Sequence, residues 1–249
     1  LLDFNDDRGK AFEVIIQFGA ILAVCWEFRH KLLSVISSFQ KNSLARRFVL
    51  NLLIASIPAM GLGFLFGKHI KALLFAPIPV ATAFIVGALV IFWAERRQLH
   101  LSTSERAIHS VDDLTPLDAL KVGLAQCAAL IPGTSRSGAT IIGGMLFGIP
   151  RVVATEFSFF LAVPTMLAVT FYSIFLKTYE NTHLKGYELL MQTNKGIQLF
   201  LIGNVVAFIV AIVAIKFFIG IIKKYGFKPW GYYRIIMGVF LVIYFTYFK

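Results

Sequence analysis

Long apolar runs alternate with shorter polar or basic segments along the chain. The apolar runs cover residues 12–28, 48–66, 80–94, 152–176, 197–219 and 232–248. Most of these runs approach the length of about 20 residues that a helix needs to cross the hydrocarbon of a membrane. The pattern therefore predicts an all-α, polytopic membrane protein. Its loops are expected at residues 67–79, 95–115, 177–195 and 221–228.

Residues 116–150 follow a different pattern, in which two short apolar pieces flank a polar centre. Pieces of about 15 and 9 residues are each too short to cross a membrane alone. We therefore expect a re-entrant helix hairpin with its tip near the middle of the membrane, surrounded by protein or by a watery cavity. Pro116 is expected at the first position of the first helix. The second helix is expected to begin near Ala139, with Ser137 or Gly138 as its cap.

Composition supports a membrane protein rather than a nucleic-acid-binding protein. The chain is 58% hydrophobic and 15% charged, against about 45–50% and about 25% in soluble domains. The formal net charge of +11 would suggest a nucleic-acid partner in a soluble protein. Here the basic residues gather in loops, where anionic lipid explains them, and no nucleic-acid-binding motif is present. Cys25 and Cys127 lie in apolar segments and are expected to be small core residues, not a disulfide or a metal site.

The distribution of Lys and Arg predicts the orientation of the chain. If residues 29–47, 95–115 and 220–234 share one side, that side carries 12 Lys and Arg residues and the other side carries 8. Cytoplasmic loops are usually the richer in these residues. The hairpin is therefore expected to enter from the cytoplasmic side. Within residues 29–47, apolar positions at helical spacing also predict a helix that lies in the membrane interface.

The centre of the hairpin carries the sequence PGTSRSGAT at residues 132–140, which we interpret as a phosphate-binding site. An arginine inside a membrane segment costs about 2.5–3.5 kcal/mol on insertion scales, so it needs a partner. The guanidinium of Arg136 matches phosphate oxygens, and the N–H groups at a helix start favour the same ligand. The substrate-binding candidates of this motif are Gly133, Thr134, Ser137 and Gly138. The alternative is a tight loop in which Arg136 binds carbonyl groups.

Further polar candidates for substrate binding lie in or beside the apolar runs. They are Glu13, Gln17 and Glu156. The first two are one helical turn apart, and an ionisable residue inside a membrane usually has a function. The alternative for this pair is a hydrogen bond between helices. Glu156 either faces the cavity or supports Arg136, whereas Asn51 and Asn204 are expected to join helices.

The two halves of the chain resemble each other, which predicts an inverted repeat. LAV occurs at residues 22–24 and 167–169, at an offset of 145, and IVG at residues 85–87 resembles IMG at residues 236–238, at an offset of 151. The charge distribution makes the matched runs cross in opposite directions, as in transport folds. We therefore expect a single transmembrane domain with repeats at residues 1–115 and 116–249. A hairpin like that of the second repeat is expected to precede Leu1.

The motif PGTSRSGAT, together with FEVIIQ at residues 12–17, EFSF at 156–159 and LAVP at 161–164, closely resembles the bacterial undecaprenyl-diphosphatase family, also called the bacitracin-resistance protein family. The resemblance covers essentially the whole chain. It implies a phosphatase of the bacterial cytoplasmic (inner) membrane that removes the terminal phosphate of undecaprenyl diphosphate, recycles this carrier lipid for peptidoglycan synthesis and confers bacitracin resistance. It also implies a site that opens to the outer face and depends on a divalent cation, Mg²⁺ or Ca²⁺. Formation of a homodimer is an open alternative to a monomer.

The resemblance implies that Ser135, Arg136 and Thr140 are catalytic residues. Arg136 would neutralise charge on the transferred phosphoryl group, and the two hydroxyls would donate hydrogen bonds. Ser135 could attack phosphorus itself, but no base lies near it in the sequence, so attack by water is favoured. The Glu-rich first motif of the family, followed by Pro, Ser and a catalytic His, is absent here. We therefore expect the metal-binding carboxylates in a hairpin before Leu1, and expect the chain alone to be inactive.

Other phosphate chemistries fit the sequence less well. There is no nucleotide-binding P-loop motif. Ile142 stands where lipid phosphatases of the phosphatidic-acid type need His, and Leu130 stands where Cys-x5-Arg phosphatases need Cys. The alternative from another class is a transporter or flippase for a polyprenyl lipid or an anion, because such proteins also have broken helices and inverted repeats. A purely structural membrane protein is the weakest alternative, because it leaves Arg136 without a role.

Overall fold

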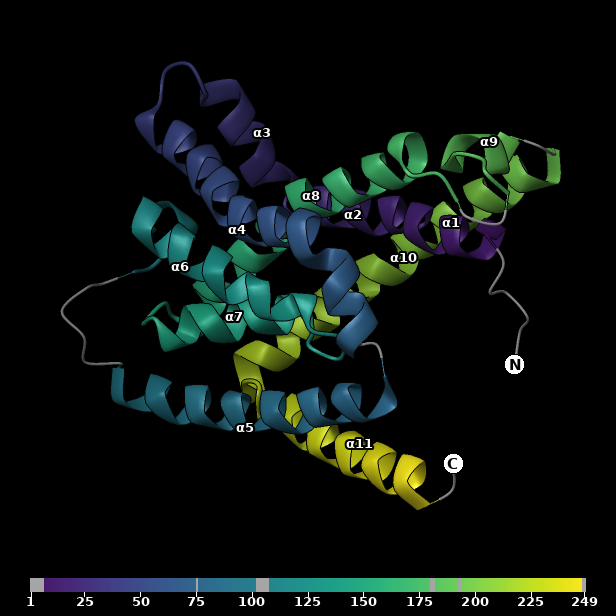
Figure 1. Cartoon of the computed structure of the whole chain (residues 1–249). Coiled ribbons are helices and arrows are strands. Elements are labelled where there is room, and N and C mark those ends of the chain that lie inside the picture. The colour runs from purple at the N-terminus through teal and green to yellow at the C-terminus, as the bar shows by residue number, and fades with distance from the viewer. Residues whose placement is uncertain (1–6, 75, 102–107, 180–181, 192–193, 248–249) are drawn as a thin grey trace. The chain divides into compact units, whose positions relative to one another are not determined.

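Every regular element that the structure describes is helical, which confirms the predicted all-α class (Figure 1). The computed structural model describes residues 7–74, 76–101, 108–179, 182–191 and 194–247. Its α-helices are α1 (Asp7–Ile15), α2 (Gln17–Glu27), α3 (Arg29–Ser38), α4 (Ser43–Leu74), α5 (Pro77–Leu101), α6 (Pro116–Gln126), α7 (Arg136–Leu146), α8 (Arg151–Phe171), α9 (Gly186–Met191), α10 (Asn194–Tyr225) and α11 (Lys228–Tyr247). Short 3-10 turns, η1 (Val111–Asp113) and η2 (Cys127–Leu130), and a π-helical turn, η3 (Tyr172–Leu176), complete them.

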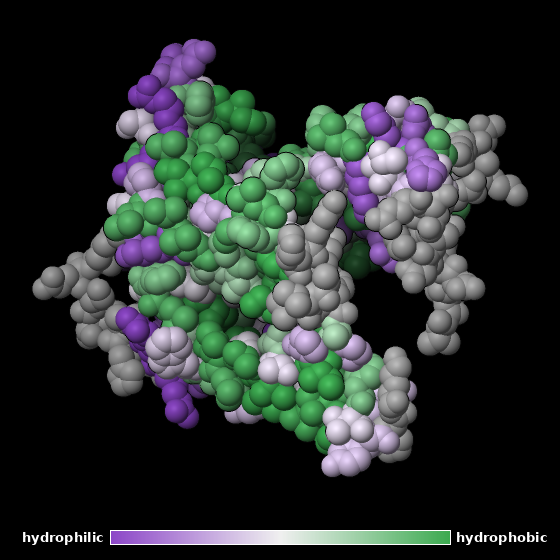
Figure 2. Space-filling view, viewed as in Figure 1, coloured by the Kyte–Doolittle hydropathy of each residue, from purple (hydrophilic) through white to green (hydrophobic). Residues whose placement is uncertain are grey.

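Several helices are long and apolar enough to cross a membrane, which confirms a polytopic membrane protein. Among the described residues they are Ser43–Gly67, Pro77–Gln98, Arg151–Leu176 and Gly196–Tyr225. Ala11–Glu27 and Arg29–Ser38 reach the same length and hydropathy as a pair, with a bend of 76° between them. The last predicted run falls in α11, which is not among these helices. Figure 2 shows hydrophobic residues over much of the visible surface of α4 and α5.

The predicted loops at residues 67–79 and 221–228 are largely helical instead, and the predicted loop 95–115 is helical up to Leu101, whereas residues 108–115 lie outside the α-helices as expected. α4, α5 and α10 continue instead through the basic residues at their ends. Lys and Arg are good helix formers whose long side chains reach water from the end of a helix. At these places the chain turns at stronger helix breakers, such as Pro77 at the start of α5 and Gly226, whose φ is +68°. Residues 102–107, inside one of the predicted loops, lie outside the described residues.

The chain folds into two compact units, of which the first consists of Leu1–Ser34 and Ala162–Phe218 and the second of Val35–Leu161 and Ile219–Lys249. In the first unit, the side-chain oxygen of Asn204 accepts a hydrogen bond of 2.8 Å from the N–H of Gly19 in α2. Its amide nitrogen donates to the Phe200 carbonyl oxygen at 2.9 Å. The prediction that Asn204 joins helices is therefore confirmed.

The second unit places the predicted hairpin between longer helices. α6 packs against α4 and α7, α7 packs against α5, and α5 packs against α11. α6 begins at Pro116, as predicted. A Cβ at Gly123 would lie 2.6 Å from the Ala55 carbonyl oxygen, so the glycine lets α6 approach the backbone of α4. The amide of Asn51 on α4 donates to the Leu114 carbonyl oxygen at 2.8 Å, so Asn51 binds the segment before α6 and not another helix as predicted.

Polar side chains near the C-terminal end of α5 fasten the base of the hairpin. Glu95 is 3% exposed, accepts a hydrogen bond of 2.8 Å from the Phe227 N–H, and forms an ion pair of 2.6 Å with Arg151 at the start of α8. Three residues further along the same helix face, Gln98 donates to the carbonyl oxygens of Met145 (3.1 Å) and Ile149 (2.9 Å). The end of α5 thus binds the end of α7, the start of α8 and the turn before α11.

Replacing Glu95 with Ala should lower the thermal unfolding midpoint much more than replacing Glu27 with Ala. Glu95→Ala removes the acceptor of Arg151, whose side chain is 27% exposed. Breaking a fully buried pair costs about 3–5 kcal/mol, and the partial exposure of Arg151 reduces that cost. Glu27 lies 4.0 Å from Lys216, whose side chain is 65% exposed, and such exposed pairs contribute about 0–1 kcal/mol. Thermal unfolding of both variants in detergent measures the difference, and equal shifts would contradict this account of the hairpin base.

Candidate active site

The backbone of the motif turns and then enters α7 at Arg136. Ser135 has extended dihedral angles (φ −66°, ψ 131°), and its Oγ accepts a hydrogen bond of 3.2 Å from the Gly138 N–H. The expected helix start near Ala139, with Ser137 or Gly138 as the cap, is therefore wrong, because both residues already lie in the first turn of α7. The N–H groups of this first turn point toward the motif turn, at the positive end of the helix dipole. Ser135 is thus the cap of a helix whose start suits an anion.

A glycine lets the motif turn lie directly against α5. Gly133 has a φ of +87°, in the left-handed region that other residues rarely adopt. A Cβ at this position would lie 2.7 Å from the Val80 carbonyl oxygen. Both the dihedral angle and the close approach therefore require glycine here.

Arg234 of α11 holds the same turn in place, and the sequence reasoning missed it. Its Nη2 donates to the carbonyl oxygens of Ala83 (2.9 Å) and Gly133 (3.0 Å), and its Nε donates to that of Phe84 (3.4 Å). A Cβ at Gly87 would lie 2.6 Å from Nη2, so this glycine makes room for the guanidinium. An arginine among apolar residues was the signal that singled out Arg136, and it applies equally to Arg234. The orientation count placed Arg234 in a cytoplasmic loop instead, whereas it lies inside α11.

Thr140 is directed into the protein. Its side chain is 2% exposed, and its hydroxyl lies 2.5 Å from the Ser158 Oγ of α8 and 3.1 Å from the carbonyl oxygens of both Arg136 and Ser137. Thr140 therefore joins α7 to α8, and its expected hydrogen bond to phosphate stays a prediction. The hydroxyls of Ser135 and Ser137 lie 3.2 Å apart at the start of α7, where Ser135 is exposed.

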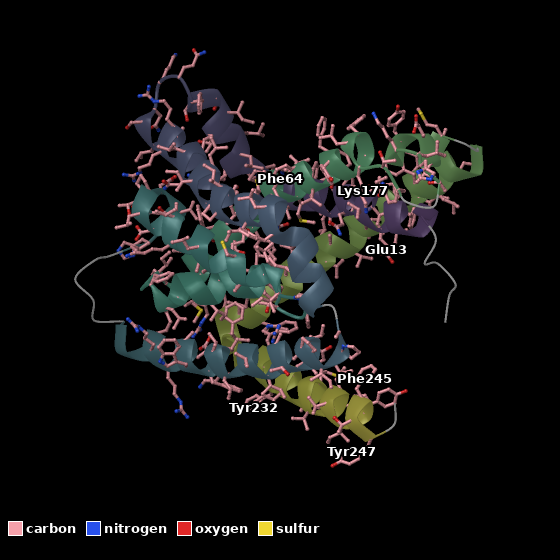
Figure 3. All side chains as sticks on the ribbon, in the orientation of Figure 1. Glu13, Phe64, Lys177, Tyr232, Phe245 and Tyr247 are labelled. Atoms are coloured by element: carbon pink, nitrogen blue, oxygen red, sulfur yellow. The ribbon has the colours of Figure 1, made fainter. Side chains whose placement is uncertain are left out.

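The other substrate-binding candidates lie on two different units. Glu156 is half-buried on α8 in the second unit, which also contains the motif. Glu13 and Gln17 belong to the first unit and are exposed there, and Figure 3 shows Glu13 on α1. The site described here is therefore built from the second unit alone, and the roles of these three residues stay predictions.

An apolar cavity of about 660 Å³ lies beside the motif turn, within the second unit. Residues of α5, α7 and η2 form most of its wall. The polar residues among those that line it are Thr82, Thr134, Ser135 and Arg234. Gly138 of the first turn of α7 also faces this space. The start of α7, which suits an anion, thus lies beside an apolar cavity. This arrangement fits a ligand with an anionic head group and an apolar tail.

The site residues are suited to an anion and not to a metal ion. Hydroxyls, a guanidinium and backbone N–H groups all donate hydrogen bonds, whereas Mg²⁺ and Ca²⁺ prefer carboxylate and carbonyl oxygens. Within the described ranges, no group of three or more His, Cys, Asp or Glu side chains is placed to hold a metal ion. The expected divalent cation therefore has no donor set among the described residues.

Comparison with known proteins identifies the family. The sequence profile of the bacitracin resistance protein BacA family matches residues 1–240 of the chain. The chain belongs to this family. It is 64% identical over 247 residues to the undecaprenyl-diphosphatase of Polynucleobacter necessarius subsp. necessarius, a match that covers 99% of this chain and 85% of that protein. The undecaprenyl-diphosphatase 1 of Burkholderia lata is 50% identical over 242 residues, with 97% and 83% covered. The undecaprenyl-diphosphatase of Ralstonia nicotianae is 48% identical over 258 residues, with 98% and 84% covered.

Replacing Gly133 with Ala in this BacA family member should destabilise it more than replacing Gly148 with Ala. Both glycines have a φ of +87°, which costs an Ala residue about 1–2 kcal/mol. No atom lies within 4 Å of a Cβ at Gly148, whereas one at Gly133 would meet the Val80 carbonyl oxygen. Gly148→Ala therefore measures the dihedral strain alone. The thermal unfolding midpoint of Gly133→Ala should be clearly lower, and equal midpoints would show that α5 does not constrain the motif turn.

Proposed function

We propose that this protein hydrolyses undecaprenyl diphosphate to undecaprenyl phosphate and inorganic phosphate. The observation that carries the proposal is the start of α7, where the Ser135 cap lies beside an apolar cavity and Arg136 is the first residue of the helix. Membership of the BacA family and the undecaprenyl-diphosphatases among its relatives support the same reaction. The reaction recycles the carrier lipid for peptidoglycan synthesis, which accounts for bacitracin resistance in the family.

In the proposed reaction, water attacks the terminal phosphorus, and the bond from that phosphorus to the bridging oxygen breaks. The guanidinium of Arg136 offers a planar pair of donors to the phosphoryl oxygens. The hydroxyls of Ser135 and Ser137 and the N–H groups of the first turn donate further hydrogen bonds where negative charge increases. These groups stabilise charge but do not accept the proton of the attacking water, so the base lies outside this set.

Water is preferred to Ser135 as the nucleophile. The Oγ of Ser135 accepts a hydrogen bond from the Gly138 N–H, as a helix cap. Its side-chain neighbour at 3.2 Å is the hydroxyl of Ser137, which is too weak a base to activate it. The hydroxyl of Ser135 therefore serves best as a donor to the phosphate.

A divalent cation, Mg²⁺ or Ca²⁺, is proposed as the cofactor on the basis of the family resemblance alone. Such an ion would neutralise charge shared by the two phosphates. The described residues around the motif offer no carboxylate cluster for it, so the steps above are confined to the residues of this chain.

The protein is a multi-pass membrane protein, and we propose the bacterial inner membrane with a site that opens to the outer face. With Arg234 inside α11, the two predicted sides carry 11 and 8 Lys and Arg residues, so the same side remains the richer. This bias supports a cytoplasmic entry of the hairpin. The proposed partner is the polyprenyl diphosphate lipid. Whether the protein forms a homodimer is left open.

Replacing Arg136 with Ala should reduce phosphate release from undecaprenyl diphosphate by about 10²–10³-fold or more, because one preorganised donor to a developing charge contributes about that much. Arg136→Lys should be intermediate, since Lys keeps the charge but loses the planar pair of donors. Arg46→Ala is the matched control, because Arg46 is exposed at the start of α4.

Inorganic phosphate is measured in detergent with the full-length protein and with Mg²⁺ or Ca²⁺ present. Release by the wild type and by Arg46→Ala, with loss in Arg136→Ala, supports the enzyme and its phosphate site. Unchanged release by Arg136→Ala contradicts the site. Absence of release by the wild type favours the transporter, which moves its ligand unchanged.

A further inference from the structure

The cavity beside the motif is an elongated groove between α5 and α7. Its lining on α5 extends from Ile78 to Ile91, and its lining on α7 extends from Ser135 to Leu146. At 1.5 Å per residue, the stretch of α5 is about 20 Å long. The groove therefore continues well beyond the space that a diphosphate needs.

Hydrogen bonds at both ends of α7 fix its direction relative to α5. The turn before α7 lies beside residues 80–84 of α5, through the contact of Gly133 with Val80 and the bonds of Arg234. The end of α7 lies beside Gln98 of α5, which binds the Met145 carbonyl oxygen. The two helices thus run in the same direction along the groove.

The groove is apolar along most of its length, and its polar side chains lie toward one end. Thr82, Thr134, Ser135 and Arg234 line the end beside the motif turn. Val90, Ile91 and Leu146 line the far end. A ligand with an anionic head and a long hydrocarbon chain matches this order of groups.

We propose that this groove binds the isoprenoid chain of the substrate, with the diphosphate at the start of α7 and the first isoprene units along α5 toward Val90 and Leu146. The assignment rests on the proposed function. Ile78 and Val86, both lining residues, are 53% and 52% exposed, so the groove is open along one side. The rest of a long chain leaves the groove there, and affinity should rise with chain length only until the groove is filled.

A bulky residue at the far end of the groove tests the proposal. Val90→Trp should fill the far end of the groove, which Leu146 also lines. Leu89→Trp is the matched control. Leu89 directly precedes Val90 on α5, does not line the groove and is 58% exposed. With a 55-carbon diphosphate, Val90→Trp should raise KM by about tenfold or more through lost apolar burial, with kcat within about twofold of wild type. Leu89→Trp should match the wild type.

Hydrolysis of a five-carbon diphosphate shows whether a raised KM comes from a blocked groove or from a misfolded protein. Such a substrate does not reach Val90, so Val90→Trp should hydrolyse it as the wild type does. Leu146→Trp is a second variant that should show the same pattern from the opposite wall. Equal KM values for the 55-carbon diphosphate in Val90→Trp, Leu146→Trp and Leu89→Trp would overturn the proposal.

A binding measurement keeps this test independent of the reaction. A non-hydrolysable isoprenoid bisphosphonate with a photoreactive group at its far end should label peptides that contain Val90 or Leu146, and Val90→Trp should reduce that labelling. Labelling confined to other helices would overturn the groove. If the wild type releases no phosphate from any diphosphate while the groove is labelled, the proposed function fails and the groove as an isoprenoid site stands.

Discussion

The organisation of the second unit depends on one constraint, the need to bond the polar backbone groups of an interrupted helix inside an apolar protein. The turn between η2 and α7 exposes carbonyl and N–H groups that a continuous helix would have paired. Arg234 donates to the Gly133 carbonyl oxygen of this turn, and Ser135 accepts from the Gly138 N–H. These two bonds set the position of the start of α7, and with it the position of Arg136.

α7 is held at its beginning, its middle and its end by different neighbours. Arg234 from α11 binds the turn before it, Ser158 from α8 binds Thr140, and Gln98 from α5 binds the carbonyl oxygens at its end. A site on a helix fixed in this way is preorganised, which is the condition for stabilising charge in a transition state.

Three arginines of this unit, Arg151, Arg234 and Arg136, lie partly buried, and burial of a guanidinium is costly unless its charge is paired or hydrogen-bonded. Arg151 pairs with the carboxylate of Glu95. Arg234 binds carbonyl oxygens of α5 and of the motif turn, and its guanidinium carbon lies 4.8 Å from the centre of the Phe84 ring. Both arginines thereby hold segments of the second unit together. Arg136 is the first residue of α7, where an anion is favoured, and the proposed phosphate would be its ligand.

Local patterns in the sequence predicted what depends on local physics. The apolar runs gave the helices, Pro116 gave the start of α6, and Asn204 was correctly expected to join helices. The ends of α4, α5 and α10 and the cap of α7 were predicted wrongly although they are local features, and other contacts were missed because a distant partner decides them. The ion pair of Glu95 with Arg151 spans 56 residues of sequence, and Arg234 binds a turn 101 residues away.

The inverted repeat stays a prediction, although one matched pair of residues has a related place in the structure. Gly87 and Gly238 were aligned at an offset of 151, and both lie where α5 meets α11. A Cβ at Gly87 would meet Arg234, and a Cβ at Gly238 would meet Ile85. No local pattern distinguishes such a packing glycine from a chance match, so the sequence alone left this relation open.

The most direct test of the central claim is a structure of the full-length protein with a non-hydrolysable isoprenoid bisphosphonate bound. The terminal phosphonate should lie within hydrogen-bond distance of the Arg136 guanidinium and of the N–H groups in the first turn of α7. Arg234 should keep its bond to the Gly133 carbonyl oxygen in that complex. A bisphosphonate bound away from the start of α7, with Arg136 turned to protein carbonyl groups instead, would contradict the account.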